Sequence, residues 1–244
     1  MLRIIEGGFS SLAYSEMKAE ILRLTNGGER VFLIVPEQQT VSAEKEMAEF
    51  LPDSAPLTFE VTNFTRFANT AYRTLGGIAA EYADSATEEL IMWKTLSELS
   101  PFLNMTDGRE EINTGLVEKA LSAVSEMKSI GAHPDELWAL SEEGEIKANT
   151  RLSKKLSDIS KIMTLYKKLL GEKYASSKDE CEKLSAKLEE HPASFSGVHF
   201  FITGFTSFTE PQLAVLRELM RRAEVTVHLT VSKRNMTRLS SPKL

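Results

Sequence analysis

The amino-terminal segment constrains the fold more than any other part of the chain. An apolar run covers residues 2–5, and Gly7 and Gly8 follow it almost at once. Beyond a few small residues, apolar side chains recur at helical spacing along residues 15–25. A short apolar run that leads through a glycine turn into a helix is typical of a strand–helix unit in a parallel sheet. The segment therefore predicts the first strand–helix unit of an α/β fold.

The same segment has the outline of a phosphate-binding loop without its chemistry. In G-x-x-x-x-G-K-[ST], the second glycine lets backbone N–H groups surround the phosphates, the lysine neutralises them, and the hydroxyl holds magnesium. Counted from Gly7, these three positions are Leu12, Ala13 and Tyr14. None of these side chains can fill those roles. The sequence therefore predicts a degenerate nucleotide loop that begins at Gly7 and Gly8 and ends at Tyr14.

The hydrophobic period changes twice along the chain and divides it into three parts. Residues 1–84 alternate apolar strands with helices, residues 85–190 show helical spacing and no convincing strand, and residues 191–244 return to the alternation. One α/β lobe with a helical insertion is more economical than three independent domains. The strands expected to share one parallel sheet are residues 2–5, 31–35, 58–62, 198–202 and 225–231. Further helices of the lobe are expected at residues 41–51 and 65–75.

After the strand at residues 198–202, a second residue expected of a nucleotide-binding lobe is missing. In nucleotide-hydrolysing lobes of this type, an apolar strand ends in an aspartate that binds magnesium through water. Here the strand ends in Thr203, followed by Gly204. A threonine cannot supply the negative charge that a magnesium–phosphate complex needs. Residues that bind magnesium or phosphate are therefore absent at two separate positions. This favours a nucleotide-binding lobe that has lost its ATP chemistry. The alternative is that neither segment was ever a nucleotide-binding motif.

Charge and composition narrow the class of protein. The net charge of −6 argues against a protein that coats nucleic acid by bulk electrostatics, although a local basic groove is compatible with it. No apolar run approaches the roughly 18 residues of a membrane helix, and no secretory signal is recognisable, so a cytoplasmic location is expected.

Metal and disulfide chemistry are not expected in this chain. The only cysteine, Cys181, leaves no internal disulfide and no cysteine-ligated cluster, and its charged helical surroundings are typical of a surface thiol. The histidines show no pair at metal-ligand spacing, so no metal site is predicted. They are His133, His191, His199 and His228.

Three segments resemble the AddB/RexB family: residues 33–47, 61–77 and 200–219. The first is the most specific, because the sequence LIVPEQQT precedes a helix there. The resemblance implies a P-loop NTPase lobe of the RecA or helicase type, with a parallel sheet and an all-helical insertion. It also implies the B subunit of a bacterial ATP-dependent helicase/deoxyribonuclease, which pairs with a helicase–nuclease A subunit to process double-strand breaks in DNA repair and recombination.

The chain departs from the family pattern at the positions that carry chemistry. Many members resemble GxxGSGKS at the loop, whereas this chain reads GGFSSLAY, and Thr203 replaces the family aspartate. The family's nuclease domain, its iron–sulfur cluster and its second helicase lobe lie outside these 244 residues. No catalytic residue is therefore carried over. The resemblance implies Mg-ATP on the partner subunit, and no cofactor is expected in this chain.

The remaining candidates are polar residues that follow two of the predicted strands. Gln38, Gln39 and Thr40 follow the strand at residues 31–35, and helicase-like lobes tend to meet the DNA backbone there. The alternative for this segment is a helix start capped by Thr40 or Ser42.

The turn after the strand at residues 58–62 supplies the other candidates. Arg66 can meet a phosphate, and Phe64 can stack on a base. The alternative for Phe64 is a place in the hydrophobic core.

Two functions stay open at this level. In the first, the chain is a DNA-guiding, ATPase-inactive lobe, and contact with DNA is directed at the backbone and weak because the sequence shows no clustered basic stripe. In the second, it is a protein–protein scaffold without nucleic-acid contact. The apolar stripe from Leu152 to Leu170 is then a possible partner surface, although packing against neighbouring helices explains it more simply.

Overall fold

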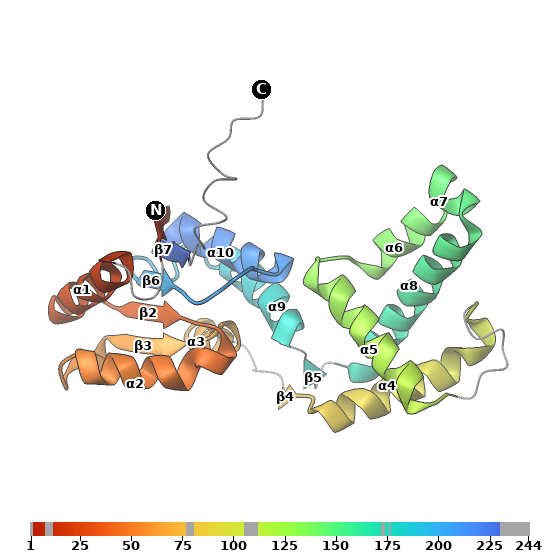
Figure 1. Cartoon of the computed structure of the whole chain (residues 1–244), viewed down its shortest axis with the longest axis horizontal. Helices are drawn as coiled ribbons and strands as arrows, with labels where there is room; N and C mark the ends of the chain where they lie inside the picture. The colour runs from red at the N-terminus through yellow and green to blue at the C-terminus, as the bar shows by residue number, and fades with distance from the viewer. Residues whose placement is uncertain are drawn as a thin grey trace. The chain divides into compact units, whose positions relative to one another are not determined.

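A computed structural model describes residues 2–7, 12–76, 81–104, 112–171, 174–175 and 177–229. The chain divides into two compact units, which are coloured along the sequence in Figure 1. The α/β unit comprises Met1–Ile78, Cys181–Phe208 and Gln212–Leu244, and the helical unit comprises Ala79–Glu180 and Thr209–Pro211. Among the described residues, no helix is both long enough and apolar enough to cross a membrane.

The α/β unit is built on one sheet in which every neighbouring pair of strands is parallel. Its order is β1-β7-β6-β2-β3. The strands are β1 (Leu2–Glu6), β2 (Val31–Ile34), β3 (Phe59–Thr62), β6 (His199–Ile202) and β7 (Glu224–Leu229). All five expected strands share this sheet, with ends that differ by one residue where the structure describes them, and residues 230–231 of the last one lie outside the described residues. The sheet confirms the predicted α/β class and is consistent with a helicase-like lobe.

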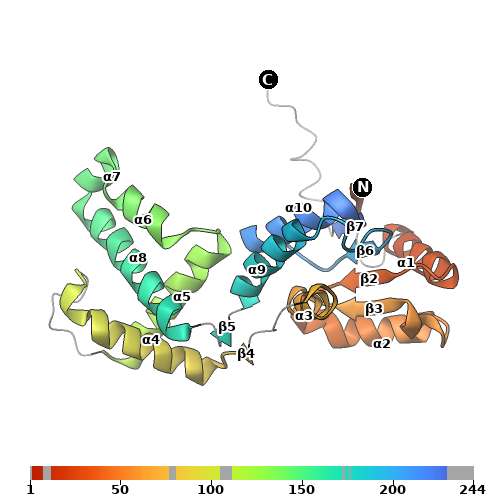
Figure 2. The same ribbon diagram turned by 180° about the vertical axis from the view of Figure 1, so that it is seen from behind.

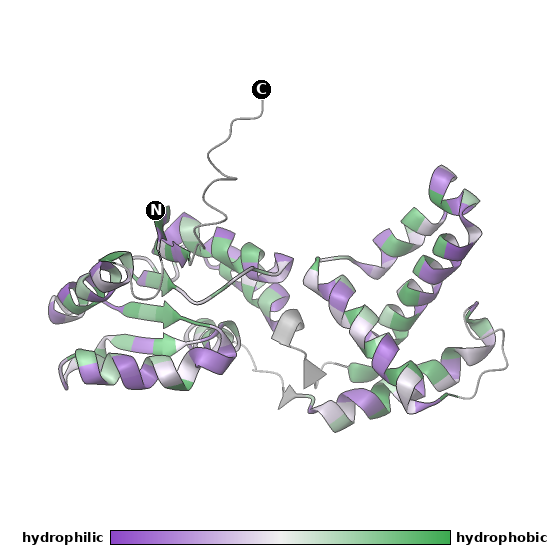
Figure 3. Ribbon diagram, viewed as in Figure 1, coloured by the Kyte–Doolittle hydropathy of each residue, from purple (hydrophilic) through white to green (hydrophobic). Residues whose placement is uncertain are grey.

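Helices cover both faces of the sheet. They are α1 (Leu12–Asn26), α2 (Thr40–Phe50), α3 (Phe64–Leu75), α9 (Ser177–Glu190) and α10 (Glu210–Arg222). Side chains alternate between the faces, so Leu33 and Phe201 join the core beneath α1 and α2, whereas Phe32 and Phe200 join the core of α3, α9 and α10. Figure 3 shows the apolar character of the central strands. Figure 2 shows α9 beside α10 from the opposite side.

The helical unit packs four helices around the longest one. These are α4 (Ser85–Leu99), α5 (Thr114–Ser129), α6 (Pro134–Ser141), α7 (Gly144–Ala148) and the long α8 (Thr150–Leu170). Its core includes Met92 of α4, Val124 of α5, and Met163 and Tyr166 of α8. The predicted apolar stripe of α8 therefore lies mostly in this core, which agrees with the packing interpretation. Leu152 is the exception, because its side chain is exposed.

Two features of the region 85–190 differ from the expectation. The two-residue strand β5 (Tyr174–Ala175) lies inside it and pairs in parallel with β4 (Glu81–Tyr82), which lies just before it, so the region is not free of strands. Cys181 is buried with Leu184 and Leu188 in a core of the α/β unit, and the prediction of a surface thiol is wrong. The spacing of charged and apolar residues along α9 indicates one apolar face. It does not indicate which of the two units that face packs against. The domain division 1–84, 85–190 and 191–244 stays a prediction.

Candidate nucleic-acid interface

Three segments meet at the edge of the sheet where its parallel strands end. Two of them, after β2 and after β3, contain the polar residues expected to contact DNA. The third follows β6, and β2 pairs with both β3 and β6, so the three segments are neighbours. Ligands of open parallel sheets bind outside the carboxyl ends of the strands, which makes this edge the place to search for a site.

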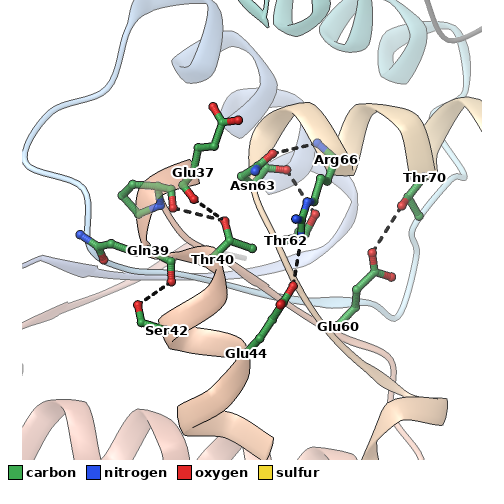
Figure 4. A network of polar contacts seen from close by, with 11 residues as sticks. Glu37, Gln39, Thr40, Ser42, Glu44, Glu60, Thr62, Asn63, Arg66 and Thr70 are labelled. Atoms are coloured by element: carbon green, nitrogen blue, oxygen red, sulfur yellow. Dashed lines mark hydrogen bonds and ion pairs between the residues drawn. The ribbon is translucent and has the colours of Figure 1, made fainter.

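The segment after β2 forms the short 3₁₀ helix η1 (Glu37–Gln39), which leads directly into α2. Gln38 is exposed, and the Gln39 side-chain amide donates a 3.5 Å hydrogen bond to the Gly204 carbonyl of the third segment. Thr40 is only 2% exposed, and its hydroxyl donates to the Glu37 carbonyl at 2.9 Å. Thr40 is therefore committed to the backbone, as Figure 4 shows. The exposed side chain of Gln38 is available to a ligand.

Thr40 and Ser42, the alternative helix caps for this segment, do not form the hydrogen bonds of a helix N-cap. The hydroxyl of Ser42 donates to the Gln39 carbonyl at 2.9 Å, as the Thr40 hydroxyl does to Glu37. Both hydroxyls thus satisfy carbonyl groups of the preceding turn instead of accepting from backbone N–H groups. These contacts hold the turn together at the start of α2.

The segment after β3 is ordered by a helix cap. The Asn63 side-chain oxygen accepts a 2.9 Å hydrogen bond from the Arg66 backbone N–H and so begins α3. The Arg66 guanidinium is exposed and lies 2.8 Å from Glu44 Oε1 of α2 (Figure 4). An exposed ion pair of this kind contributes about 0–1 kcal/mol. A phosphate can therefore compete with Glu44 for Arg66 at little cost.

Phe64 lies beneath this surface. It is 4% exposed and belongs to the core of the sheet, where its ring meets the Phe205 ring edge-to-face at a centroid distance of 5.6 Å. Phe205 in turn stacks on Phe208 at 4.9 Å. The base-stacking role expected for Phe64 does not fit this burial, and the core alternative does.

The half-buried rings of Phe205 and Phe208 are aromatic groups at this candidate interface that sequence reasoning missed. Both lie in the segment after β6. Their signal in the sequence is the aromatic spacing of GFTSF. That spacing gains meaning only once β6 is known to lie beside β2.

The degenerate loop lies at the β1 side of the same edge. Gly7 continues the strand pairing, because its N–H donates a 3.0 Å hydrogen bond to the Leu229 carbonyl. Gly8 lies outside the described residues. Leu12 begins α1 with an exposed side chain, and Ala13 is half-buried. Leu12, the position where a phosphate loop would place its second glycine, thus lies in α1.

Tyr14 and Thr203, two of the vacated positions, are linked through His228. The Thr203 hydroxyl lies 2.9 Å from His228 Nδ1, and both side chains are buried. The Tyr14 ring lies 5.6 Å from the His228 ring. The register brings this about, since Ile202 of β6 pairs with Val227 of β7. His228 is a third residue that sequence reasoning did not single out for this site, because only the pairing of β6 with β7 connects it to Thr203.

The electrostatics of this cluster favour neutral groups. The Tyr14 hydroxyl donates a 3.0 Å hydrogen bond to Glu46, whose carboxylate also pairs with Lys18 at 2.9 Å. Burial, with the neighbouring Glu46 carboxylate, raises the pKa of Tyr14 well above its usual range. Burial lowers the pKa of His228 and so favours its uncharged form. Within the described ranges, no three His, Cys, Asp or Glu side chains are grouped so that they could hold a metal ion.

Comparison with known proteins points to one family. Residues 7–243 match the family described as "ADDB, N-terminal". The B subunit of the ATP-dependent helicase/deoxyribonuclease of Caldanaerobacter subterraneus subsp. tengcongensis is 31% identical over 202 residues, which cover 82% of this chain and 17% of that protein. The protein of the same name from Clostridioides difficile is 29% identical over 232 residues, 93% of this chain and 20% of that protein. The chain therefore spans about a fifth of the length of these relatives.

Proposed function

The chain belongs to the AddB family, and we propose that it forms an amino-terminal, helicase-like lobe that guides DNA without turning over ATP. Its relatives are named as the B subunit of an ATP-dependent helicase/deoxyribonuclease. On this proposal, the chain serves a helicase–exonuclease that acts in double-strand break repair and recombination. Mg-ATP is held by the A subunit, which supplies the turnover. The iron–sulfur cluster that the family implies belongs to a carboxy-terminal domain outside this chain.

The loss of ATP chemistry is supported by what fills the vacated positions. Leu12 lies in α1, Tyr14 bonds to Glu46, and Thr203 bonds to His228. A magnesium–phosphate complex needs a lysine and a carboxylate here, and it would meet buried neutral groups instead. The polar atoms of Tyr14 and Thr203 are satisfied within the protein.

Calorimetry tests this part of the proposal. Titration of the protein with Mg-ATP is expected to show no binding in the micromolar range. Micromolar affinity that Thr203→Ala removes would contradict the proposal, because it would place the nucleotide at the end of β6. The Ser42→Ala variant, at the start of α2, serves as a control for changes unrelated to that position.

The guiding of DNA is supported most directly by the convergence of the three segments at the ends of β2, β3 and β6. They present exposed Gln38 and Arg66 beside the half-buried rings of Phe205 and Phe208. An arginine, an amide and aromatic rings on one edge form the set that single-stranded nucleic acid uses, with the cation on the phosphate and the rings against bases. Arg66 and Gln38 are the residues on which this role depends.

The affinity for single-stranded DNA across a salt series tests the guiding role. Arg66→Ala is expected to weaken binding and to reduce the salt slope by about 0.7, the value for one phosphate contact on a single strand. Gln38→Ala is expected to weaken binding with little change in slope, because it removes no charge. Glu44→Gln is expected to strengthen binding, because it releases Arg66 from its ion pair.

Arg73→Ala is the matched control, since Arg73 is an exposed arginine at the other end of α3. If Arg66→Ala and Gln38→Ala leave the affinity for single-stranded DNA and its salt slope unchanged, the guiding role is contradicted. The alternative, a protein–protein scaffold without nucleic-acid contact, is then favoured.

One observation, a pair of exposed apolar side chains on α4, supports both the scaffold alternative and the expected pairing with an A subunit. Leu90 and Trp93 lie three residues apart on α4, and both side chains are exposed, at 69% and 52%. Apolar side chains on one face of a helix are suited to a protein partner. Co-purification of the full-length protein with its candidate A subunit, for the natural protein and for Trp93→Ser, tests this contact. A complex that forms equally well with Trp93→Ser would place the partner elsewhere.

A further inference from the structure

The solvent side of α8 carries a regular row of lysines, so the expectation that the chain shows no clustered basic stripe is wrong for this helix. Lys154, Lys161 and Lys168 are spaced by seven residues along the helix. Two turns of helix span about seven residues and about 10 Å, so these side chains line one side of it. Ser157 and Thr164 lie between them at spacings of three and four, so they belong to the same row, although the Thr164 hydroxyl donates a 2.9 Å hydrogen bond to the Ser160 carbonyl. We call these five residues the basic face of α8.

The packing of α8 fixes the direction of this face. Ile159, Met163 and Tyr166 lie in the core of the helical unit, on the opposite side of the helix. Lys154 and Lys168 are exposed, and Lys161 retains 31% of its side-chain surface. The face therefore points away from the core of its own unit.

The charge of α8 contrasts with that of the whole protein. The only acid on the helix, Asp158, is 1% exposed, and its Oδ1 accepts hydrogen bonds from the backbone and side chain of Asn104 at 3.0 and 2.9 Å. The basic residues of α8 are Arg151, Lys154, Lys155, Lys161, Lys167 and Lys168. The protein as a whole has a net charge of −6. A basic helix on an acidic protein concentrates positive potential in one place.

The three lysines of the face are not equivalent. Lys161 Nζ donates a 3.0 Å hydrogen bond to the Phe102 carbonyl and lies 3.9 Å from Asp158 Oδ1. Lys154 and Lys168 make no ion pair with any part of the chain that the structure describes. Lys161 thus also helps to hold the helical unit together, whereas Lys154 and Lys168 lack such a structural contact among the described residues.

We propose that the basic face of α8 binds the phosphate backbone of duplex DNA. Lysine ammonium groups and a serine hydroxyl such as that of Ser157 are phosphate ligands, and contacts to phosphates carry no sequence information. Single strands are usually held by aromatic stacking as well, and this face has no aromatic ring, since Tyr166 is buried. A straight row of cations on a rigid helix fits the regular backbone of a duplex. The inference rests on the proposed function only in that the protein meets DNA.

Binding of a short labelled duplex across a salt series tests the proposal. The double variant Lys154→Gln/Lys168→Gln is expected to lose roughly tenfold in affinity for each lysine at about 50 mM salt, and its salt slope is expected to fall by about two units. The matched control is Lys94→Gln/Lys119→Gln, which removes two exposed lysines of α4 and α5 and changes the net charge equally. The control is expected to keep the natural slope. Thermal unfolding of both variants establishes that they are folded.

Several outcomes would overturn the proposal. An unchanged slope for the α8 variant would show that the face does not meet the duplex. An equal loss in the control would assign the effect to overall charge. Retained duplex affinity with loss of the protein partner would make the face a protein-docking surface. Arg66 is tested with single-stranded DNA and the basic face of α8 with duplex DNA. Either proposal can therefore be contradicted while the other is supported.

Discussion

The carboxyl edge of the sheet has two halves, which differ in how their polar groups are satisfied. In the closed half, His228 bonds to Thr203 and its ring lies near the Tyr14 ring, at the positions where the sequence predicts a degenerate nucleotide site. In the open half, Gln38 and Arg66 remain exposed, in η1 after β2 and at the start of α3. Both halves belong to one sheet with a single parallel pattern of pairing. The backbone thus allows a ligand at either half, and the side chains decide where one can enter.

The difference has a simple physical basis. A buried hydroxyl or imidazole loses free energy unless it finds a hydrogen-bond partner, so polar side chains that are buried together must satisfy one another. Thr203 and His228 do so at 2.9 Å. An exposed side chain has no such requirement, because water serves it until a ligand arrives. Substitutions in the closed half should therefore change stability, and those in the open half should change binding.

The largest expected effect separates the open half from the core beneath it. Phe64→Ala should lower the free energy of unfolding by about 3–5 kcal/mol, because it removes a buried ring that packs against Phe205. Arg66→Ala, two residues later and exposed, should change it by less than about 1 kcal/mol. Denaturant unfolding of both variants measures the contrast. A stable Phe64→Ala protein that had lost its affinity for DNA would restore the base-stacking role.

A substitution at Gly204 tests the close approach of the segment after β6 to the segment after β2. Its φ of +85° is left-handed, and an added Cβ would meet the Gln39 side chain and lie 3.0 Å from Pro36 Cδ. Gly204→Ala should therefore cost about 2–4 kcal/mol, through backbone strain and overpacking together. Gly28→Ala is the matched control, since Gly28 also has a positive φ but open space around it, and it should cost only about 1–2 kcal/mol. Equal losses in thermal unfolding would mean that the approach of Gln39 to Gly204 contributes nothing.

The internal bond of the closed half should be measurable by itself. Thr203→Val keeps the shape of the side chain and removes the hydroxyl that faces His228 Nδ1, so it should cost about 1–3 kcal/mol. Thr62→Val is a suitable comparison, because the buried Thr62 hydroxyl makes only a 3.3 Å bond to the Asn63 carbonyl. Calorimetric unfolding should show the smaller loss there. The reverse order would mean that the Thr203–His228 contact does not hold the closed half together.

The smallest expected effect is a pH dependence from His228. Burial lowers its pKa in the folded protein, whereas the unfolded chain takes up the proton at the ordinary value near 6.5. The stability is therefore fully present above about pH 6.5 and falls as the pH drops below it, by at most about 1.4 kcal/mol per pH unit. The fall ends once the pH passes the pKa of the folded state. Unfolding free energies for the natural protein and for His228→Leu should differ in slope over this range, and parallel slopes would contradict the assignment.

The sequence by itself determined the local elements and the chemistry they lack. Apolar runs of strand length and helical spacing are local signals, so the five strands and the α/β class could be predicted, with the described strand ends correct to within one residue. The absence of lysine and aspartate at Ala13 and Thr203 is likewise a matter of residue identity. The polar segments after β2 and β3 were found because they follow recognisable strands.

Only the tertiary structure decided which of these pieces are neighbours. Strand order places β6 between β7 and β2, and so brings Thr203 to His228 and Gly204 to Gln39, partners separated by 25 and 165 residues. The burial of Phe64 and Cys181 and the outward direction of the lysines of α8 are decided in the same way. The physical reason is that periodicity reports that one face of an element is buried, whereas the identity of the partner depends on pairing between distant parts of the chain, for which a single sequence carries no local signal.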